Sequence, residues 1–289
     1  MLGDAVVLTI QAVYMNDSNQ VNPQQGRADN IAIRSSLSDV LEAAPETLFA
    51  EHSDARRLFH GRGQLYAGLE FLTVDLFYPI LWCVLYKEPE QELWDLLKAE
   101  LVAFAESKQL CCMIQYRYEK SAPSECAYGS LPSKTVAWES GLQYELILGR
   151  SQNIVYFMDF KTGRDWLAER VAGKRVLNLF SYTCATSVSA IAKGAAKVVN
   201  VDMSRSAMRQ GEANHAINGF GDCIGRRSPK EQAATAEPGS GDVVMLAYDL
   251  FRSWKNIRKQ GPYDIVIIDP PSRQRGSFEA EKDYHRVLR

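Results

Sequence analysis

Residues 175–202 read RVLNLFSYTCATSVSAIAKGAAKVVNVD, and this stretch decides the fold. An apolar run over 175–179 is followed by a helical pattern over 183–193, which Gly194 closes, and then by a second apolar run over 197–201. Short apolar runs that alternate with helices are typical of buried parallel strands joined by crossover helices. The stretch therefore predicts a strand–helix–strand unit.

The same alternation continues toward the end of the chain. We expect a helix over 204–218 with Ser204 as its N-cap, a strand over 243–247, a helix over 251–260 and a strand over 263–268. Four strands in alternation with helices predict an α/β fold, namely a Rossmann-like parallel sheet with helices on both faces.

The chain changes character near its middle. Residues 1–149 contain 11 Lys and Arg against 20 Asp and Glu, whereas residues 150–289 contain 22 against 15. An acidic half joined to a basic half indicates two domains, with the basic one turned toward an anionic partner. We therefore predict a small N-terminal α+β domain at 1–149 and the parallel-sheet domain at 150–289. In the first domain we expect helices over 36–48 and 90–107, strands over 69–77, 80–86 and 110–118, a loop over 121–133 and a hairpin over 135–148.

Composition excludes several classes of protein. With 46% hydrophobic and 24% charged residues over 289 positions, the chain resembles neither a disordered nor a collagen-like protein. No apolar run approaches the roughly 20 residues that span a bilayer, and Ala5–Val13 lacks the features of a secretory signal. Six cysteines without CxxC spacing are expected to be reduced and mostly buried. We therefore expect a cytoplasmic protein with no membrane partner and no metal.

Polar residues follow the predicted strands at the positions where an open parallel sheet binds ligands. Asp202 ends the second strand, about 20 residues after the first loop, which is the spacing at which an acid receives ribose hydroxyls. Asp249 follows the third strand, and Asp269 follows the fourth. The carboxyl ends of parallel strands lie at one edge of the sheet, so these acids are expected to share one site.

The loop after the first strand distinguishes between cofactors. Ser181, Thr183 and Thr186 stand where a dinucleotide fingerprint has its three glycines, so a pyrophosphate would meet side chains. S-adenosylmethionine (SAM) has a ribose without a phosphate; Asp202 suits its hydroxyls and Asp249 its adenine amino group. The predicted cofactor-binding residues of the sheet are Asn178, Phe180, Ser181, Tyr182, Thr183, Asp202, Met203 and Asp249.

The sequence Asp269-Pro270-Pro271 predicts a rigid corner at the end of the fourth strand. Each proline fixes its φ near −65°, and the residue before a proline is driven toward an extended backbone. Such a corner is suited to hold a planar base against a cofactor.

The motifs 176–183, 201–205 and 267–272 resemble those of class I SAM-dependent methyltransferases, with the greatest likeness to the bacterial 23S ribosomal RNA large-subunit methyltransferases of the I and K types. Residues 152–159 with the arginine that follows resemble that family's hairpin over the cofactor. Residues 55–149 resemble, more weakly, the α+β domain that precedes the family's catalytic domain. The resemblance adds Gln152, Phe157, Asp159 and Arg164 to the expected cofactor-binding residues.

The resemblance also implies a reaction and a partner. The substrate would be ribosomal RNA, methylated at a base of the guanine N7 or cytosine C5 type. Asp269, Pro270 and Pro271 would be catalytic, and Arg273 and Arg275 would contact RNA. The domain at 1–149 would help to recognise the substrate. The sequence leaves the modified nucleotide and the oligomeric state open.

Three departures from the family pattern affect these expectations. Cys184 stands where the family has glycine, and the segment 221–242 is unusually long. The family's fold continues through three further strands beyond the position of Arg289, so we expect either a truncated chain with an unpaired edge at the fourth strand or a fold completed in another way. The alternative to an enzyme is a non-catalytic remnant that binds SAM or RNA. A nicotinamide-dependent dehydrogenase is disfavoured because the glycines are absent.

Overall fold

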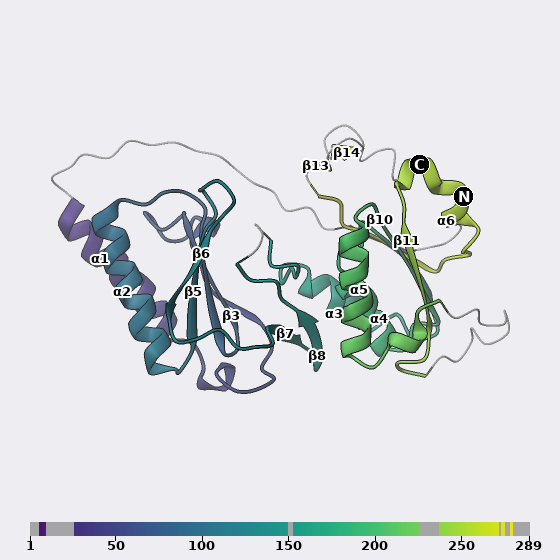
Figure 1. The fold of residues 1–289 in the computed structure, drawn as a ribbon, viewed down its shortest axis with the longest axis horizontal. Helices are drawn as coiled ribbons and strands as arrows, with labels where there is room; N and C mark the ends of the chain where they lie inside the picture. Colours follow the sequence, from purple (N-terminus) through teal and green to yellow (C-terminus); the bar gives the residue numbers. More distant parts are fainter. Residues whose placement is uncertain are drawn as a thin grey trace. The chain divides into compact units, whose positions relative to one another are not determined.

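The computed structural model describes residues 6–9, 26–149, 153–225, 237–271, 273–274 and 278–279. The chain divides into two compact units (Figure 1). The first unit combines Met1–Tyr14 with Asp159–Arg289, and the second is Met15–Met158. The boundary expected between residues 149 and 150 is therefore corrected in two respects: the division falls after Met158, and the N-terminal segment groups with the C-terminal half.

The first unit contains a five-stranded sheet in the order β1-β12-β9-β10-β11. Every neighbouring pair in this sheet is parallel, which confirms the predicted Rossmann-like architecture. The strands are β1 (Val6–Thr9), β9 (Arg175–Leu179), β10 (Lys197–Asp202), β11 (Asp242–Ala247) and β12 (Ile265–Ile268).

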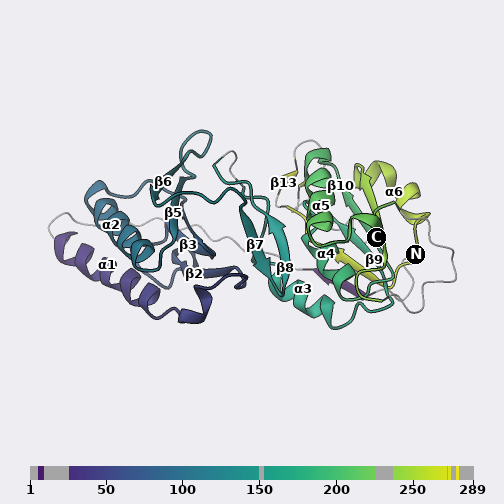
Figure 2. The ribbon, with the colours of Figure 1, turned by 60° about the horizontal axis from the view of Figure 1, so that its bottom comes forward.

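The N-terminal strand β1 pairs with β12 and lies at one edge of the described sheet. Val6 is the register partner of Ile265, and Thr9 is the partner of Ile268 (Figure 2, β1 in purple). The expectation of an unpaired edge at the fourth predicted strand is therefore wrong. All four residues of β12 are buried, so its backbone N–H and C=O groups need hydrogen-bond partners on both sides. Strand β9 supplies them on one side and β1 on the other.

Helices cover both faces of this sheet, as predicted. The helices are α3 (Lys161–Ala168), α4 (Ala185–Ala192), α5 (Arg205–Ile217) and α6 (Leu250–Arg258). Successive residues of a strand point to opposite faces. Val176 accordingly packs in one buried cluster with Ile191 of α4, whereas Leu177 packs in a second cluster with Ile257 of α6. Ser204 caps α5 as expected, since its Oγ accepts a hydrogen bond from the backbone N–H of Ala207 at 3.1 Å.

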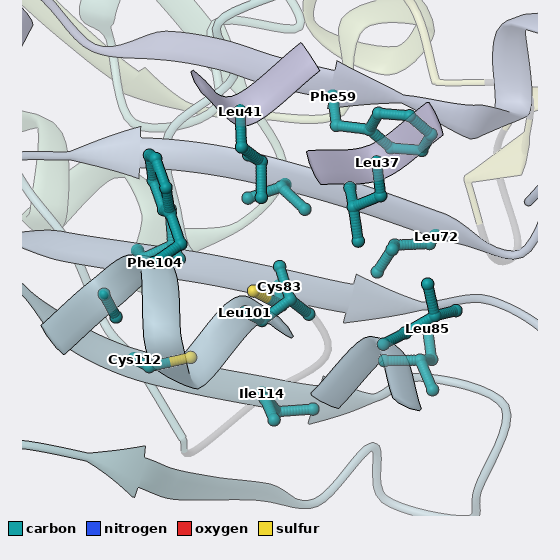
Figure 3. Packing of buried hydrophobic residues seen from close by; sticks show 14 of the residues in the cluster. Leu37, Leu41, Phe59, Leu72, Cys83, Leu85, Leu101, Phe104, Cys112 and Ile114 are labelled. Atoms are coloured by element: carbon teal, nitrogen blue, oxygen red, sulfur yellow. The ribbon is translucent and has the colours of Figure 1, made fainter. Parts of the chain in front are cut away.

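The second unit contains a sheet in the order β2-β3-β4-β5-β6. Helices α1 and α2 pack together, and residues of both belong to one buried core with the sheet (Figure 3). Leu37 of α1 and Leu101 of α2 are fully buried there. The elements are α1 (Gly26–Glu42), β2 (Arg56–His60), β3 (Leu72–Phe77), β4 (Ile80–Leu85), α2 (Gln91–Ser107), β5 (Cys111–Tyr116) and β6 (Ser124–Tyr128), and a hairpin of β7 (Val136–Glu139) and β8 (Leu142–Glu145) follows.

Two local predictions in this unit are wrong. The helix expected over 36–48, with Pro45 ending it early, is α1, which does end ahead of Pro45, at Glu42, but begins at Gly26. The loop expected over 121–133 contains the edge strand β6. Its sequence SECAY has no fully buried position, and its extended conformation is instead imposed by pairing with β5.

Across the described part of the chain, no helix combines the length and apolar character needed to cross a bilayer.

Candidate functional site

The loop between β9 and α4 has an unusual backbone. Phe180, Tyr182 and Cys184 have φ values of 56°, 47° and 60°, so three non-glycine residues in alternate positions are left-handed. That conformation costs roughly 1–2 kcal/mol for a residue with a Cβ atom. Two backbone hydrogen bonds hold the loop, from Ser181 N–H to Val201 O at 3.1 Å and from Cys184 N–H to Ser181 O at 2.8 Å. Strain of this kind persists only where surrounding structure imposes it, and it concentrates at functional sites.

Asp202, at the end of β10, is part of what imposes this conformation. Its Oδ2 accepts a hydrogen bond from the backbone N–H of Tyr182 at 2.9 Å, and its Oδ1 accepts one from Ser204 N–H at 2.8 Å. From α5, the Asn214 side-chain amide donates to the carbonyl of Thr183 at 2.9 Å. One carboxylate therefore joins the loop after β9 to the start of α5, and each of its oxygens keeps acceptor capacity for a ligand hydroxyl.

A chain of buried polar side chains lies behind this loop. Asn178 donates to Asn200 Oδ1 at 2.9 Å, and Asn200 donates to Ser187 Oγ at 2.9 Å. Ser187 Oγ lies 3.0 Å from His215 Nε2, and His215 Nδ1 lies 2.7 Å from the Gly211 carbonyl. Because that carbonyl only accepts, Nδ1 carries the proton, and Nε2 accepts from Ser187. Burial lowers the pKa of His215 to about 4, so the ring is neutral.

This network gives Asn178 a structural partner and contains further residues that were not predicted from the sequence; the expected contact of Asn178 with the cofactor stays a prediction. Asn178 is 3% exposed, and its side chain donates to Asn200 of the neighbouring strand. Asn200, Ser187 and His215 are the members of the network that were not predicted from the sequence. The signal was present in the sequence, because an Asn occupies the fourth position of two apolar strands, and the register pairs Asn178 with Asn200.

Cys184 and Gly211 form a close contact between the loop and α5. A Cβ atom built on Gly211 would lie 2.6 Å from Cys184 Sγ and 3.0 Å from Cys184 Cβ. Cys184 is completely buried and has a left-handed backbone conformation. Glycine adopts that conformation without strain, which explains why the family pattern has glycine at this position. The larger residue in the loop is accommodated because the helix has glycine opposite it.

Asp249, at the end of β11, caps α6. One carboxylate oxygen accepts hydrogen bonds from the backbone N–H groups of Phe251 at 2.9 Å and Arg252 at 3.2 Å. The second oxygen lies 3.6 Å from the Arg252 guanidinium. The contact expected between Asp249 and an adenine amino group stays a prediction. Asp249 would make that contact while it also caps α6.

Two large apolar side chains are exposed beside these acids. Met203 follows Asp202 and is 37% exposed, and Tyr248 follows Ala247 and is 38% exposed. Because Asp202 and Ala247 are register partners, Met203 and Tyr248 follow the ends of adjacent strands. Exposed apolar side chains at a ligand-binding edge are suited to a flat ring. The sequence analysis named Met203 and missed Tyr248.

Asp269 follows β12 and lies near two other charged residues of the first unit. The pKa of Asp269 is raised to about 6, first by burial of its carboxyl group and then by the negative charge of Asp159. The positive charge of Arg164 lowers this pKa and so reduces the shift. Arg164, on α3, is 2% exposed. The structure thus brings Asp159 and Arg164 into electrostatic contact with the predicted base-binding corner. A carboxyl group with a perturbed pKa at a strand end is typical of a functional site.

The remaining predicted residues are less defined. Gln152 and Arg275 lie outside the described residues. Phe157 belongs to the second unit and is 47% exposed. Arg273 lies in the two-residue strand β13 (Arg273–Gln274), which pairs with β14 (Phe278–Glu279). Pro270 and Pro271 come directly after Asp269, at the carboxyl end of β12.

The carboxyl-terminal edge of the sheet offers groups of the kinds that suit a nucleoside. Asp202 offers carboxylate oxygens to hydroxyl groups, the left-handed loop offers backbone groups, and Met203 and Tyr248 offer apolar surface. The described residues contain no group of three or more His, Cys, Asp or Glu side chains that could hold a metal. A parallel sheet with an acid at the second strand end and a non-glycine loop after the first defines the class of Rossmann-like domains that bind a nucleoside without a pyrophosphate cradle.

Comparison with known proteins identifies the family within this class. Residues 56–289 match the S-adenosylmethionine-dependent methyltransferase family, and the chain belongs to that family. This result confirms the resemblance inferred from the motifs.

Two curated relatives show how far the similarity extends. The chain is 29% identical over 246 residues to a ribosomal RNA large subunit methyltransferase of Deinococcus radiodurans, a match that covers 82% of this chain and 55% of the relative. It is 28% identical over 215 residues to the ribosomal RNA large subunit methyltransferase I of Vibrio cholerae, covering 71% and 49%. The chain therefore spans about half the length of these relatives.

Solved structures agree with this assignment. SMU.776, crystallised in complex with S-adenosylhomocysteine, is similar with a TM-score of 0.69 and 25% identity, covering 93% of this chain and 64% of that one. A SAM-dependent methyltransferase from Agrobacterium tumefaciens shares the fold with a TM-score of 0.52 at 17% identity, covering 73% and 62%.

Proposed function

We propose that this chain belongs to an enzyme that transfers a methyl group from SAM to a base of large-subunit ribosomal RNA. The observation that carries the proposal is the placement of Asp202 at the end of β10, where its carboxylate holds the left-handed loop after β9. The names of the curated relatives support ribosomal RNA as the substrate.

The residues at the sheet edge fit the parts of SAM. Asp202 accepts hydrogen bonds from the two ribose hydroxyls while it keeps its bonds to the loop. Met203 and Tyr248 contact the adenine ring, and Asp249 accepts from its amino group. The backbone of the loop over 180–183 binds the amino-acid tail. When bound, SAM supplies the electrophilic methyl group on its sulfonium.

The corner at Asp269, Pro270 and Pro271 positions the acceptor base. Asp269 holds the polar edge of the base, and the fixed prolines keep the corner rigid. A base within folded RNA must first be exposed or flipped, which costs a few kcal/mol. The enzyme then acts by holding the nucleophile in line with the methyl group and by excluding water.

We propose a guanine N7 type of acceptor in preference to cytosine C5. A ring nitrogen with a free lone pair attacks without prior loss of a proton, so the site needs no general base. The C5 chemistry of the family uses a cysteine nucleophile. Cys184 and Cys223, in the first unit, are 0% and 2% exposed, and this burial keeps both thiols from a base.

A second set of residues, in the second unit, supports RNA as the partner. The guanidinium groups of Arg62 and Arg117 lie over the ring of Tyr86, at 4.1 Å and 5.2 Å from its centroid. Arg62 follows β2, Tyr86 follows β4 and Arg117 follows β5, and these three strands run in the same direction, so their carboxyl ends share one edge of the sheet. Guanidinium planes stack on unpaired bases and neutralise phosphates. We propose this edge as the substrate-recognition surface of the N-terminal part, in addition to Arg273 and Arg275.

Methyl transfer from isotopically labelled SAM to ribosomal RNA from cells that lack the modification tests the proposal. We expect label in one nucleotide of the large-subunit RNA, identified by nuclease digestion and mass spectrometry, and none with fully modified RNA. Binding of SAM and of RNA without transfer would instead favour a non-catalytic module. An absence of SAM binding would overturn the site itself.

A further inference from the structure

Four cysteines of the second unit lie in two pairs on neighbouring strands, and the two sulfur atoms of one pair are in contact. Cys111 of β5 and Cys126 of β6 have their sulfur atoms 3.7 Å apart. Cys83 of β4 and Cys112 of β5 form the second pair, and burial together with the neighbouring Cys112 side chain raises the pKa of Cys83. Neighbouring residues of β5 point to opposite faces, so the two pairs lie on opposite faces of the sheet. All four residues are free thiols in this structure.

The two pairs differ in their access to solvent. Cys126 is exposed, whereas its partner Cys111 is 4% exposed. Cys83 and Cys112 are both 0% exposed and belong to the buried core shown in Figure 3. An oxidant in solution can therefore reach the first pair through Cys126, and it reaches neither member of the second.

Strand β6 is held so that the first pair stays in contact. Glu125 accepts hydrogen bonds from Lys98 of α2 at 2.6 Å and from the Tyr116 hydroxyl of β5 at 2.5 Å. The Cys126 thiol also lies within hydrogen-bond distance of the Tyr128 carbonyl, at 3.4 Å. A pair that is already fixed by its neighbours loses little conformational freedom when it is cross-linked.

We propose that Cys111 and Cys126 form a reversible disulfide when the protein meets a peroxide, and that this bond fastens the edge strand β6 to β5. Because β6 is an edge strand bound on one side only, β5 is its sole sheet neighbour among the described strands. This inference does not depend on the proposed methyltransferase function.

The chemistry balances with hydrogen peroxide as the oxidant. The Cys126 thiolate attacks one peroxide oxygen, an S–O bond forms, the O–O bond breaks, and hydroxide leaves and becomes water. The Cys111 sulfur then attacks the sulfenic sulfur, an S–S bond forms, and the S–O bond breaks. The leaving hydroxide takes the Cys111 proton as water. Two thiols lose two hydrogen atoms in total, and one peroxide becomes two waters.

The experiment exposes the reduced, full chain to dilute hydrogen peroxide, blocks the remaining thiols with iodoacetamide and maps the peptides by mass spectrometry. We expect a cross-linked pair of peptides that contain Cys111 and Cys126, lighter by two hydrogen atoms and separated by dithiothreitol. Cys83 and Cys112 should be alkylated only after denaturation. Cross-links between any other cysteines, or an uncoupled sulfinic acid at Cys126, would overturn the proposal.

Two variants make the result specific. Cys126→Ser, a change at an exposed position, should abolish the cross-link and leave Cys111 reduced. Cys223→Ser, in the first unit, should leave the cross-link unchanged. The closed loop joins residues 15 apart, and oxidation should raise the thermal midpoint of the second unit by about 10 °C in the unchanged chain but not in Cys126→Ser. A cross-link that forms without a shift in the midpoint would overturn the fastening of β6.

Discussion

The carboxylate of Asp202 accepts a hydrogen bond from the backbone N–H of Tyr182 at 2.9 Å, across 20 residues of sequence. This bond ties the end of β10 to the left-handed loop after β9. The same carboxylate therefore shapes the loop and stands where ribose hydroxyls are expected. Loss of the carboxylate should affect binding and local stability together.

Asp202→Asn tests this dual role. The amide has one oxygen for the two backbone donors that Asp202 now accepts from, so one of the N–H groups of Tyr182 and Ser204 loses its acceptor. We expect affinity for S-adenosylhomocysteine to fall at least tenfold, about 1.4 kcal/mol, by isothermal titration calorimetry. Asp222→Asn, an exposed change in the same unit, should bind normally. Equal affinities for the two variants would refute the cofactor site at Asp202.

Asp269→Asn tests the base-binding corner. We expect methyl transfer to fall at least a hundredfold, about 2.7 kcal/mol, because the carboxylate that holds the base is lost, while affinity for S-adenosylhomocysteine changes less than threefold. The unchanged enzyme should gain activity as the pH rises through about 6, where Asp269 ionises. Single-turnover transfer and calorimetry separate the two effects. A parallel loss of binding and transfer would show that Asp269 serves the cofactor.

The raised pKa of Asp269 also predicts a change in stability with pH. The folded chain holds the proton of the Asp269 carboxyl group more tightly than the unfolded chain does. This protonation therefore adds to the free energy of unfolding below pH 3.8, and the addition is lost as the pH rises to about 6. Asp269→Asn should therefore be more stable than the unchanged chain at pH 7, with the difference shrinking toward pH 4. Thermal unfolding at several pH values measures it. A constant difference across this range would contradict the shift.

His215 should act in the opposite sense. Its pKa is lowered from 6.5 to about 4, so its contribution to stability is present above pH 6.5 and is lost as the pH falls to about 4. His215→Gln should remove this part of the pH dependence, whatever its effect at pH 7. Urea unfolding across this range measures the slope, and the exposed His52→Gln serves as the control. If the free energy of unfolding of His215→Gln still fell by the same amount between pH 6.5 and 4, a group other than His215 would cause that fall.

Gly211→Ala should destabilise the chain, although alanine is the better helix former by about 1 kcal/mol. The added methyl group would meet Cys184 Sγ at 2.6 Å, and overpacking of this kind costs about 1–3 kcal/mol. In a Cys184→Gly background the same change should cost less, since the clash is gone. Urea unfolding of the unchanged chain, the two single variants and the double variant gives the coupling free energy between the two positions. The exposed Glu212→Ala serves as the control. If the two substitutions changed the free energy of unfolding additively, the structure around Cys184 would have made room for the added methyl group at no cost.

The arginines over Tyr86 should contribute to RNA affinity. Arg62→Ala with Arg117→Ala is expected to weaken binding of ribosomal RNA and to lower the slope of log affinity against log salt by about 1–2, since each lost phosphate contact contributes about 0.7–0.9. Arg34→Ala is a suitable control, because Arg34 is ion-paired with Glu100 at 2.9 Å. Filter binding at several salt concentrations measures both values. Affinity and slope equal to those of Arg34→Ala would exclude this edge from the interface.

Much of the first unit could be predicted because its signals are local. Strand β9 lies where the apolar run placed it, and Ser204 caps α5 as its residue type indicates. Edge strand β6 could not be predicted, since its conformation depends on pairing with β5 rather than on its own pattern. Tyr248 was missed because an aromatic residue after a strand is ordinary until the register with β10 is known.

The sequence by itself determined the alternation of strands and helices, the acids at the strand ends and the family to which the chain belongs, because each depends on residues close together in the chain. The tertiary structure decided that β1 pairs with β12, that Asn178 meets Asn200, and that Cys111 contacts Cys126. These pairings depend on strand order and register, which the packing of the whole chain selects. A local pattern shows that a strand exists, and only the folded chain shows which strand lies beside it.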